Sequence, residues 1–70
     1  MTPATAKKAA REALGKRKGK TQVEYASLDP KTLCITVTLD DGRGHTWSGP
    51  ATASSATVRK HFASWLAKIA

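Results

Sequence analysis

The sequence predicts an α+β domain of order α-β-β-β-α, in which a three-stranded antiparallel sheet packs against a C-terminal amphipathic helix. Residues 32–39 alternate apolar and polar side chains, which is the period of a half-buried strand. Residues 55–69 repeat apolar side chains with a helical period. Residues 40–44 carry the Asp and Gly residues of a hairpin loop. With 70 residues the chain can bury only one small core, so these elements are expected to share it.

Residues 3–14 are predicted to form the first helix. Pro3 suits a first helical position behind the cap Thr2, the segment is rich in alanine, and Gly15 is a plausible stop. The apolar stripe is thin, so this helix is expected to dock weakly, or to form when a partner neutralises its charges. Residues 16–20 are predicted to be a mobile basic linker. The expected organisation is therefore a basic arm over residues 1–20 and a small βββα domain over residues 21–70.

Residues 21–28 are predicted to be the first strand and residues 45–48 the third. The hairpin loop between the second and third strands leaves two pairings open. A two-residue turn over residues 41–42 sets Trp47 opposite Thr36, away from the core. A three-residue turn over residues 41–43 sets Trp47 opposite Val37, in the core, and Gly44 favours this longer loop because it suits a bulge.

The last helix, residues 55–69, is expected to begin at a Ser54 or Ser55 cap. Its apolar residues fall on one stripe that faces the sheet. The predicted core consists of Leu14, Val23, Tyr25, Leu28, Leu33, Ile35, Val37, Leu39, Trp47, Val58, Phe62, Trp65, Leu66 and Ile69. Cys34 is expected to be a small buried hydrophobe within the second strand.

Charge is distributed unevenly along the chain. The formal net charge is +7; residues 1–20 carry seven basic residues against one acidic residue, Glu12, while residues 21–70 carry five against four. A basic segment of this kind is typical of an interaction tail for a polyanion. The candidate contacts are Lys7, Lys8, Arg11, Lys16, Arg17, Lys18, Lys20, Arg43, Arg59, Lys60 and Lys68.

The sequence contains no recognisable catalytic or metal-binding pattern. His45 and His61 lack metal-ligand spacing with Cys34, and adjacent Asp40 and Asp41 suit turn chemistry at a hairpin tip. We therefore expect no enzyme activity, no cofactor, no metal and no small-molecule substrate. No apolar stretch is long enough to span a bilayer, and a cytoplasmic location without a membrane partner is expected.

Two resemblances to known families concern nucleic acids. The element order, with Tyr25, residues 33–39, Trp47-Ser48-Gly49 and Val58…Phe62…Leu66, resembles the double-stranded-RNA-binding domain. That family places a lysine cluster at the start of its last helix, where this chain has Ser54-Ser55-Ala56-Thr57. Residues 41–49 resemble the core of the DNA-binding domain of H-NS-type nucleoid proteins. Each resemblance implies binding to a duplex.

The expected function is low-specificity binding to the phosphate backbone of double-stranded DNA or RNA. Most aromatic residues belong to the predicted core, which disfavours a stacking platform for single strands. The main alternative is a small phage-type inhibitor or adaptor that binds an acidic surface of a partner protein. A structural subunit of a larger assembly is a further alternative. The short format would suit a phage or bacterial accessory protein.

Overall fold

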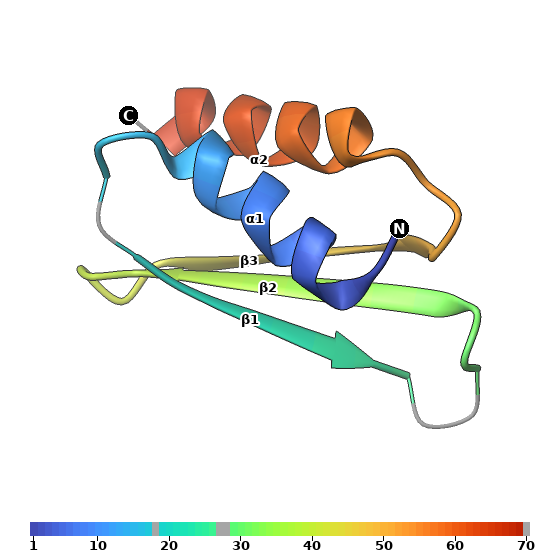
Figure 1. Ribbon diagram of the computed structural model, residues 1–70. Coiled ribbons are helices and arrows are strands. Elements are labelled where there is room, and N and C mark those ends of the chain that lie inside the picture. Colours follow the sequence, from blue (N-terminus) through green and yellow to red (C-terminus); the bar gives the residue numbers. More distant parts are fainter. Residues whose placement is uncertain (18, 27–28, 70) are drawn as a thin grey trace.

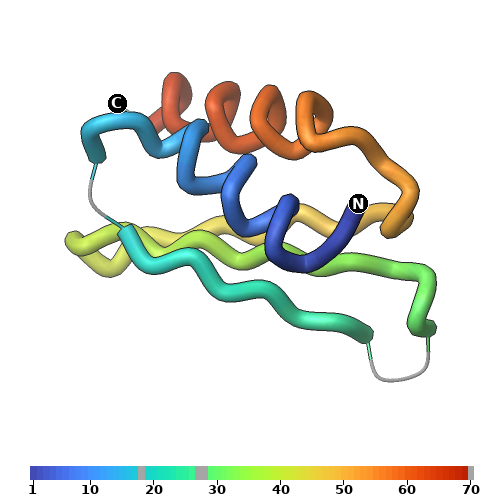
Figure 2. The backbone as a smooth tube through the Cα atoms, viewed as in Figure 1, coloured from blue at the N-terminus to red at the C-terminus, as the bar shows by residue number. Residues whose placement is uncertain are grey.

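The computed structural model describes residues 1–17, 19–26 and 29–69, and it has the predicted α+β class. The elements are, in order, α1 (Pro3–Leu14), β1 (Gly19–Tyr25), β2 (Thr32–Leu39), β3 (Gly44–Pro50) and α2 (Ser55–Ile69). Both helices lie on one face of the three-stranded sheet, and the other face has no helix over it (Figure 1). The end of α1, the β2–β3 hairpin and the end of α2 gather at one end of the molecule (Figure 2).

The sheet is antiparallel with strand order β1-β2-β3. Because side chains alternate along a strand, one face collects Leu33, Ile35 and Val37, which are fully buried. The opposite face is hydroxyl-rich: Thr36 and Thr46 are hydrogen-bonded across β2 and β3 at 3.1 Å. The sheet therefore buries a single apolar face, as the alternation in β2 predicts.

Cys34 belongs to the open face and not to the core. It is half-buried, and its Sγ lies 3.4 Å from Ser48 Oγ. The expectation of a buried hydrophobe is wrong, because the alternation that turns Leu33 and Ile35 inward turns the residue between them outward.

The β2–β3 hairpin has a pairing that neither sequence alternative contained. Leu39 N–H donates to the Arg43 carbonyl at 2.7 Å, and Gly42 N–H donates to the Leu39 carbonyl at 3.0 Å. The loop is thus Asp40-Asp41-Gly42, and Ile35 is the residue opposite Trp47. Trp47 does lie in the core, as preferred from the sequence. The glycine with positive φ is Gly42, at 92°, and not Gly44; a three-residue loop closes most easily on a glycine at that position.

Helix α1 packs against the same core as the sheet. Its N-cap is Thr2, whose Oγ1 accepts from Thr5 N–H, and Gly15 ends it with a φ of 60°. Ala6 and Ala10 are fully buried and Ala9 is 1% exposed. Small side chains let a helix backbone approach its neighbours closely, which is why a thin alanine stripe suffices here. The weak docking expected from the sequence is thus replaced by close packing.

Strand β1 begins at Gly19, so the segment expected to be a mobile linker is shorter than residues 16–20. The boundary expected after residue 20 falls inside this strand. Residues 27–28 of the predicted first strand, including the core candidate Leu28, lie outside the described residues. Tyr25 was expected in the core but is 47% exposed, because it ends an edge strand that pairs only with β2.

Helix α2 runs over its predicted range and turns its apolar stripe to the sheet. Ser54 Oγ accepts from Thr57 N–H at 3.3 Å, which identifies Ser54 as the cap. Val58 and Phe62 are fully buried, while the stripe's later members Trp65, Leu66 and Ile69 are half-buried against the core. The core therefore lies between the sheet and the two helices.

Candidate functional site

The cationic side chains of α1 project away from the core. Lys8 and Arg11 are exposed, and Lys7 is half-buried on the flank of the helix. They occupy this side because the alanine stripe of the same helix is turned to the core. Within the described part of the chain, no carboxylate lies within ion-pair distance of any of the three.

Charge separates by layer in the folded chain. The two helices together carry six basic residues and one acidic residue, whereas the three strands carry Lys20 against Glu24. The helical layer therefore has a formal charge of +5 and the strands a charge of zero. An asymmetry that looks like arm against domain along the sequence is, in three dimensions, one helical surface against a neutral sheet.

Arg59 links the two helices. Its Nη1 lies 3.2 Å from Glu12 Oε2, and both side chains remain nearly half exposed. Exposed pairs of this kind contribute about 0–1 kcal/mol to stability. Arg59 therefore sits among the cations of the helical layer but is already engaged by the only acidic residue of that layer.

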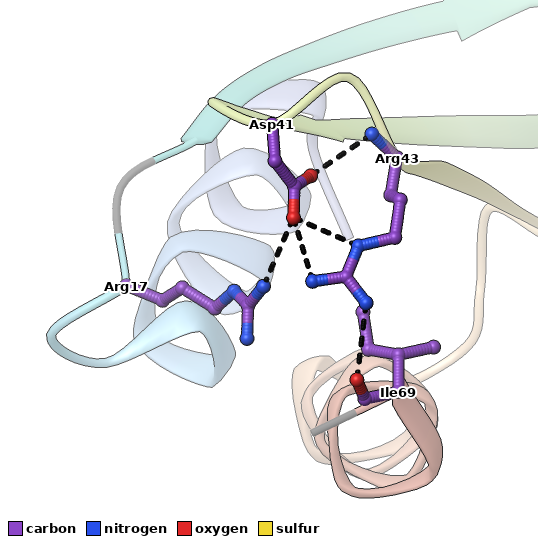
Figure 3. Close-up of polar contacts among 4 residues, drawn as sticks. All are labelled: Arg17, Asp41, Arg43 and Ile69. Atoms are coloured by element: carbon purple, nitrogen blue, oxygen red, sulfur yellow. Dashed lines mark hydrogen bonds and ion pairs between the residues drawn. The ribbon is translucent and has the colours of Figure 1, made fainter.

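Arg17 and Arg43 share Asp41 at one end of the molecule (Figure 3). Asp41 Oδ2 lies 2.6 Å from Arg43 Nη2 and 3.4 Å from Arg17 Nη2. Arg43 Nη1 also donates to the Ile69 carbonyl at 3.0 Å, which satisfies a carbonyl in the last turn of α2. These contacts join the hairpin to the end of α2, so Arg43 has a structural role as well as a charge.

The electrostatics of this end follow from the same contacts. Hydrogen bonds from the side chain and backbone N–H of Arg43 hold the pKa of Asp41 below its usual range, and the same side-chain bond raises the pKa of Arg43. Two guanidinium groups on one carboxylate leave a positive remainder. Exposed Lys16 precedes Arg17, and exposed Lys68 precedes Ile69, so the end stays cationic beside the acid.

The remaining candidates divide between two faces. Lys60 is exposed on α2, with Ser64 and Lys68 following it one and two turns later on the same ridge. Lys20 is exposed on β1, where it borders a hollow of about 440 Å³ at the hairpin end of the sheet. Lys18 lies outside the described residues. The structure therefore brings most candidates to the helical layer and its end, and places Lys20 elsewhere.

A histidine pair that the sequence analysis did not single out lies between β3 and α2. The Nε2 atoms of His45 and His61 are 2.7 Å apart. The ring planes differ by 18° and the centroids are 4.9 Å apart, so the rings meet edge to edge at these nitrogens. One ring must donate and the other accept. The correct hairpin register would have revealed the pair, because it places His45 two residues from Trp47 on the core face.

Aromatic side chains surround the pair. Phe62 meets both imidazoles edge-on, with centroids 6.0 Å from His45 and 5.4 Å from His61. Trp65 lies parallel to His45 at 5.3 Å. Burial is the largest cause that lowers the pKa of His61, and the charges of His45 and Lys68 lower it further. The pair is therefore held in its neutral form.

Comparison of the chain with protein-family models, curated proteins and solved structures finds no match. Across residues 1–17, 19–26 and 29–69, no helix is long and apolar enough to cross a membrane. The same residues contain no group of three or more His, Cys, Asp or Glu side chains placed to hold a metal ion. The candidate site therefore rests on its own geometry and charge.

The histidine pair predicts a loss of stability in mild acid. Because the folded pKa of His61 lies below its unfolded value of 6.5, the unfolded chain binds more protons as the pH falls past that value. This stabilising contribution is complete above 6.5 and is lost as the pH falls towards the folded pKa. Urea unfolding at about pH 7.5 and about pH 5.5 should show lower stability in acid.

A His61→Gln variant should show a smaller drop, because glutamine can hydrogen-bond to His45 without titrating. The contribution of Asp41 falls in a separate window below 3.8, since its folded pKa is lowered. Equal stability of the wild-type chain at the two pH values would contradict the assignment.

Proposed function

We propose that this chain binds the phosphate backbone of a nucleic-acid duplex, with low sequence specificity, through the outer surface of its helical layer. The observation that carries the proposal is the +5 charge of the two helices beside a neutral sheet. Lysine and arginine contacts to phosphate supply affinity but carry no base information. The α-β-β-β-α order, which the double-stranded-RNA-binding domain also has, supports the same proposal as an analogy.

The close packing of α1 strengthens this proposal. Lys8 and Arg11 stand on a helix whose opposite side is buried, so their backbone positions are fixed before a partner arrives. A fixed scaffold loses less conformational entropy on binding than a mobile arm would. Lys60 extends the cationic surface onto α2, while Arg59 must share its charge with Glu12.

Labelled duplex DNA and duplex RNA, titrated with the full chain and followed by fluorescence anisotropy, test the proposal. Affinity should fall steeply between about 50 and 200 mM salt, because each neutralised phosphate releases counterions. The double variant Lys8→Gln with Arg11→Gln should bind about tenfold or more weakly, and should flatten the salt slope by roughly two contacts. Single strands of the same sequence should bind less tightly.

A matched control removes the same amount of charge from the other side of the molecule. Gln22→Glu with Lys31→Gln also lowers the net charge by two, but at exposed positions on β1 and near the start of β2. This variant should keep the wild-type salt slope. Affinity that does not change with salt, or an equal loss in both double variants, would exclude a duplex surface on the helices. Nuclease-resistant capture of one acidic protein would favour the inhibitor or adaptor alternative.

A further inference from the structure

The histidine pair borders a hollow that is lined by hydrogen-bond donors. The hollow has a volume of about 240 Å³ and is formed by His45, His61, Ser64, Trp65 and Lys68. A hydroxyl, an ammonium and imidazole nitrogens can all donate to an oxyanion. None of the lining residues is acidic. The chemistry of the lining therefore suits an anion and offers a cation nothing.

This hollow adjoins the cationic surface of the helical layer. Ser64 and Lys68 line it and follow Lys60 on one ridge of α2 at intervals of four residues. Residues four apart are neighbours on a helix surface. A phosphate backbone that contacts Lys60 can therefore continue into the hollow, whose remaining wall is contributed by β3 through His45.

The pair can take up one proton without losing its internal bond. In the neutral pair a single N–H joins the two Nε2 atoms, which are 2.7 Å apart. A first added proton makes one ring an imidazolium, and the N–H···N bond becomes charge-assisted. The charged groups that face this proton are Lys68 on α2 and, further along β3 and the hairpin, Arg43, which Asp41 holds. No described carboxylate lines the hollow, so an added positive charge lacks a counter-charge there.

We propose that this hollow is a phosphate subsite of the duplex-binding surface, and that its occupation is coupled to the uptake of one proton by the His45–His61 pair. The inference rests on the proposed function, because it assigns one phosphate of the duplex to a named place. A phosphate oxygen supplies the counter-charge that the hollow lacks. Binding and protonation then favour each other by the same factor.

The first test measures duplex affinity of the full chain at about pH 7.5 and about pH 5.5. Wild-type affinity should rise by roughly three- to tenfold in acid, a factor of ten corresponding to a shift of one pKa unit on binding. The salt slope should steepen by about 0.9, the value for one additional phosphate. His61→Gln should bind at both pH values without these changes, and the control Lys31→Gln should keep them.

The second test uses the unmodified protein and so does not depend on how a variant folds. Imidazole resonances followed by NMR give the titration of the pair alone, with saturating duplex, and with inorganic phosphate. A higher pKa with the duplex supports the inference, whether or not inorganic phosphate also raises it. A rise with inorganic phosphate alone would assign the hollow to free phosphate and overturn the duplex subsite.

The two proposals fail in distinguishable ways. A duplex that binds while the histidine titration stays unchanged overturns the subsite and leaves the proposed function intact. A duplex that binds at neither pH overturns both. Unchanged pH and salt dependence in His61→Gln would likewise show that the pair takes no part in phosphate recognition.

Discussion

We expect Phe62→Ala to lower the free energy of unfolding by about 3–5 kcal/mol, the usual cost of removing a fully buried aromatic side chain. Phe62 is the largest fully buried residue and contacts His45, His61 and Trp65 edge-on. Its removal leaves a cavity between the sheet and α2. For a domain of this size such a loss is most of the available stability.

Urea unfolding followed by circular dichroism measures this change. Tyr25→Ala is the matched control, since it also truncates an aromatic ring but at a position that is 47% exposed. The control should change stability much less, by under about 1 kcal/mol. Similar losses in the two variants would contradict the placement of the core between the sheet and the helices.

We expect Ala10→Leu to lower the free energy of unfolding by about 1–3 kcal/mol through overpacking. Ala10 is fully buried on the side of α1 that faces the core. Leucine adds three heavy atoms there with nearly the same helix propensity as alanine. The loss would establish that α1 belongs to the folded domain and is not a detachable arm.

Ala4→Leu provides the control, because Ala4 is exposed on the same helix. Its effect should stay within about 0.5 kcal/mol. An Ala10→Leu variant as stable as the wild type would contradict the docking of α1. If the docking holds, deletion of residues 1–20 removes part of the core and the start of β1, so such a deletion cannot isolate the contribution of the charges.

The strands and α2 could be predicted from the sequence because their periodicity is strong. The alternation over residues 32–39 and the apolar stripe of residues 55–69 each match one secondary structure. The hairpin register was missed because Gly42 and Gly44 both suit a loop. The choice between them depends on the pair of hydrogen bonds that joins Leu39 to Arg43 and Gly42, and neither bond leaves a local sequence pattern.

The docking of α1 and the histidine pair could not be predicted for a related reason. Alanine adds little hydrophobic signal, yet its small size lets α1 approach the core closely. His45 and His61 are 16 residues apart, and only the register of β3 together with the rotation of α2 brings their nitrogens together. The candidate cations were identifiable from charge alone, whereas their grouping on two helices required the fold.

The separation of a +5 helical layer from a neutral sheet gives the molecule a permanent electric dipole directed from strands to helices. Such a dipole experiences a torque in the field of any extended polyanion. The chain would therefore turn its helices towards that polyanion during diffusion, before contact. At low ionic strength, where the field reaches about 30 Å, a larger share of collisions would be productive, and the association rate would fall with added salt.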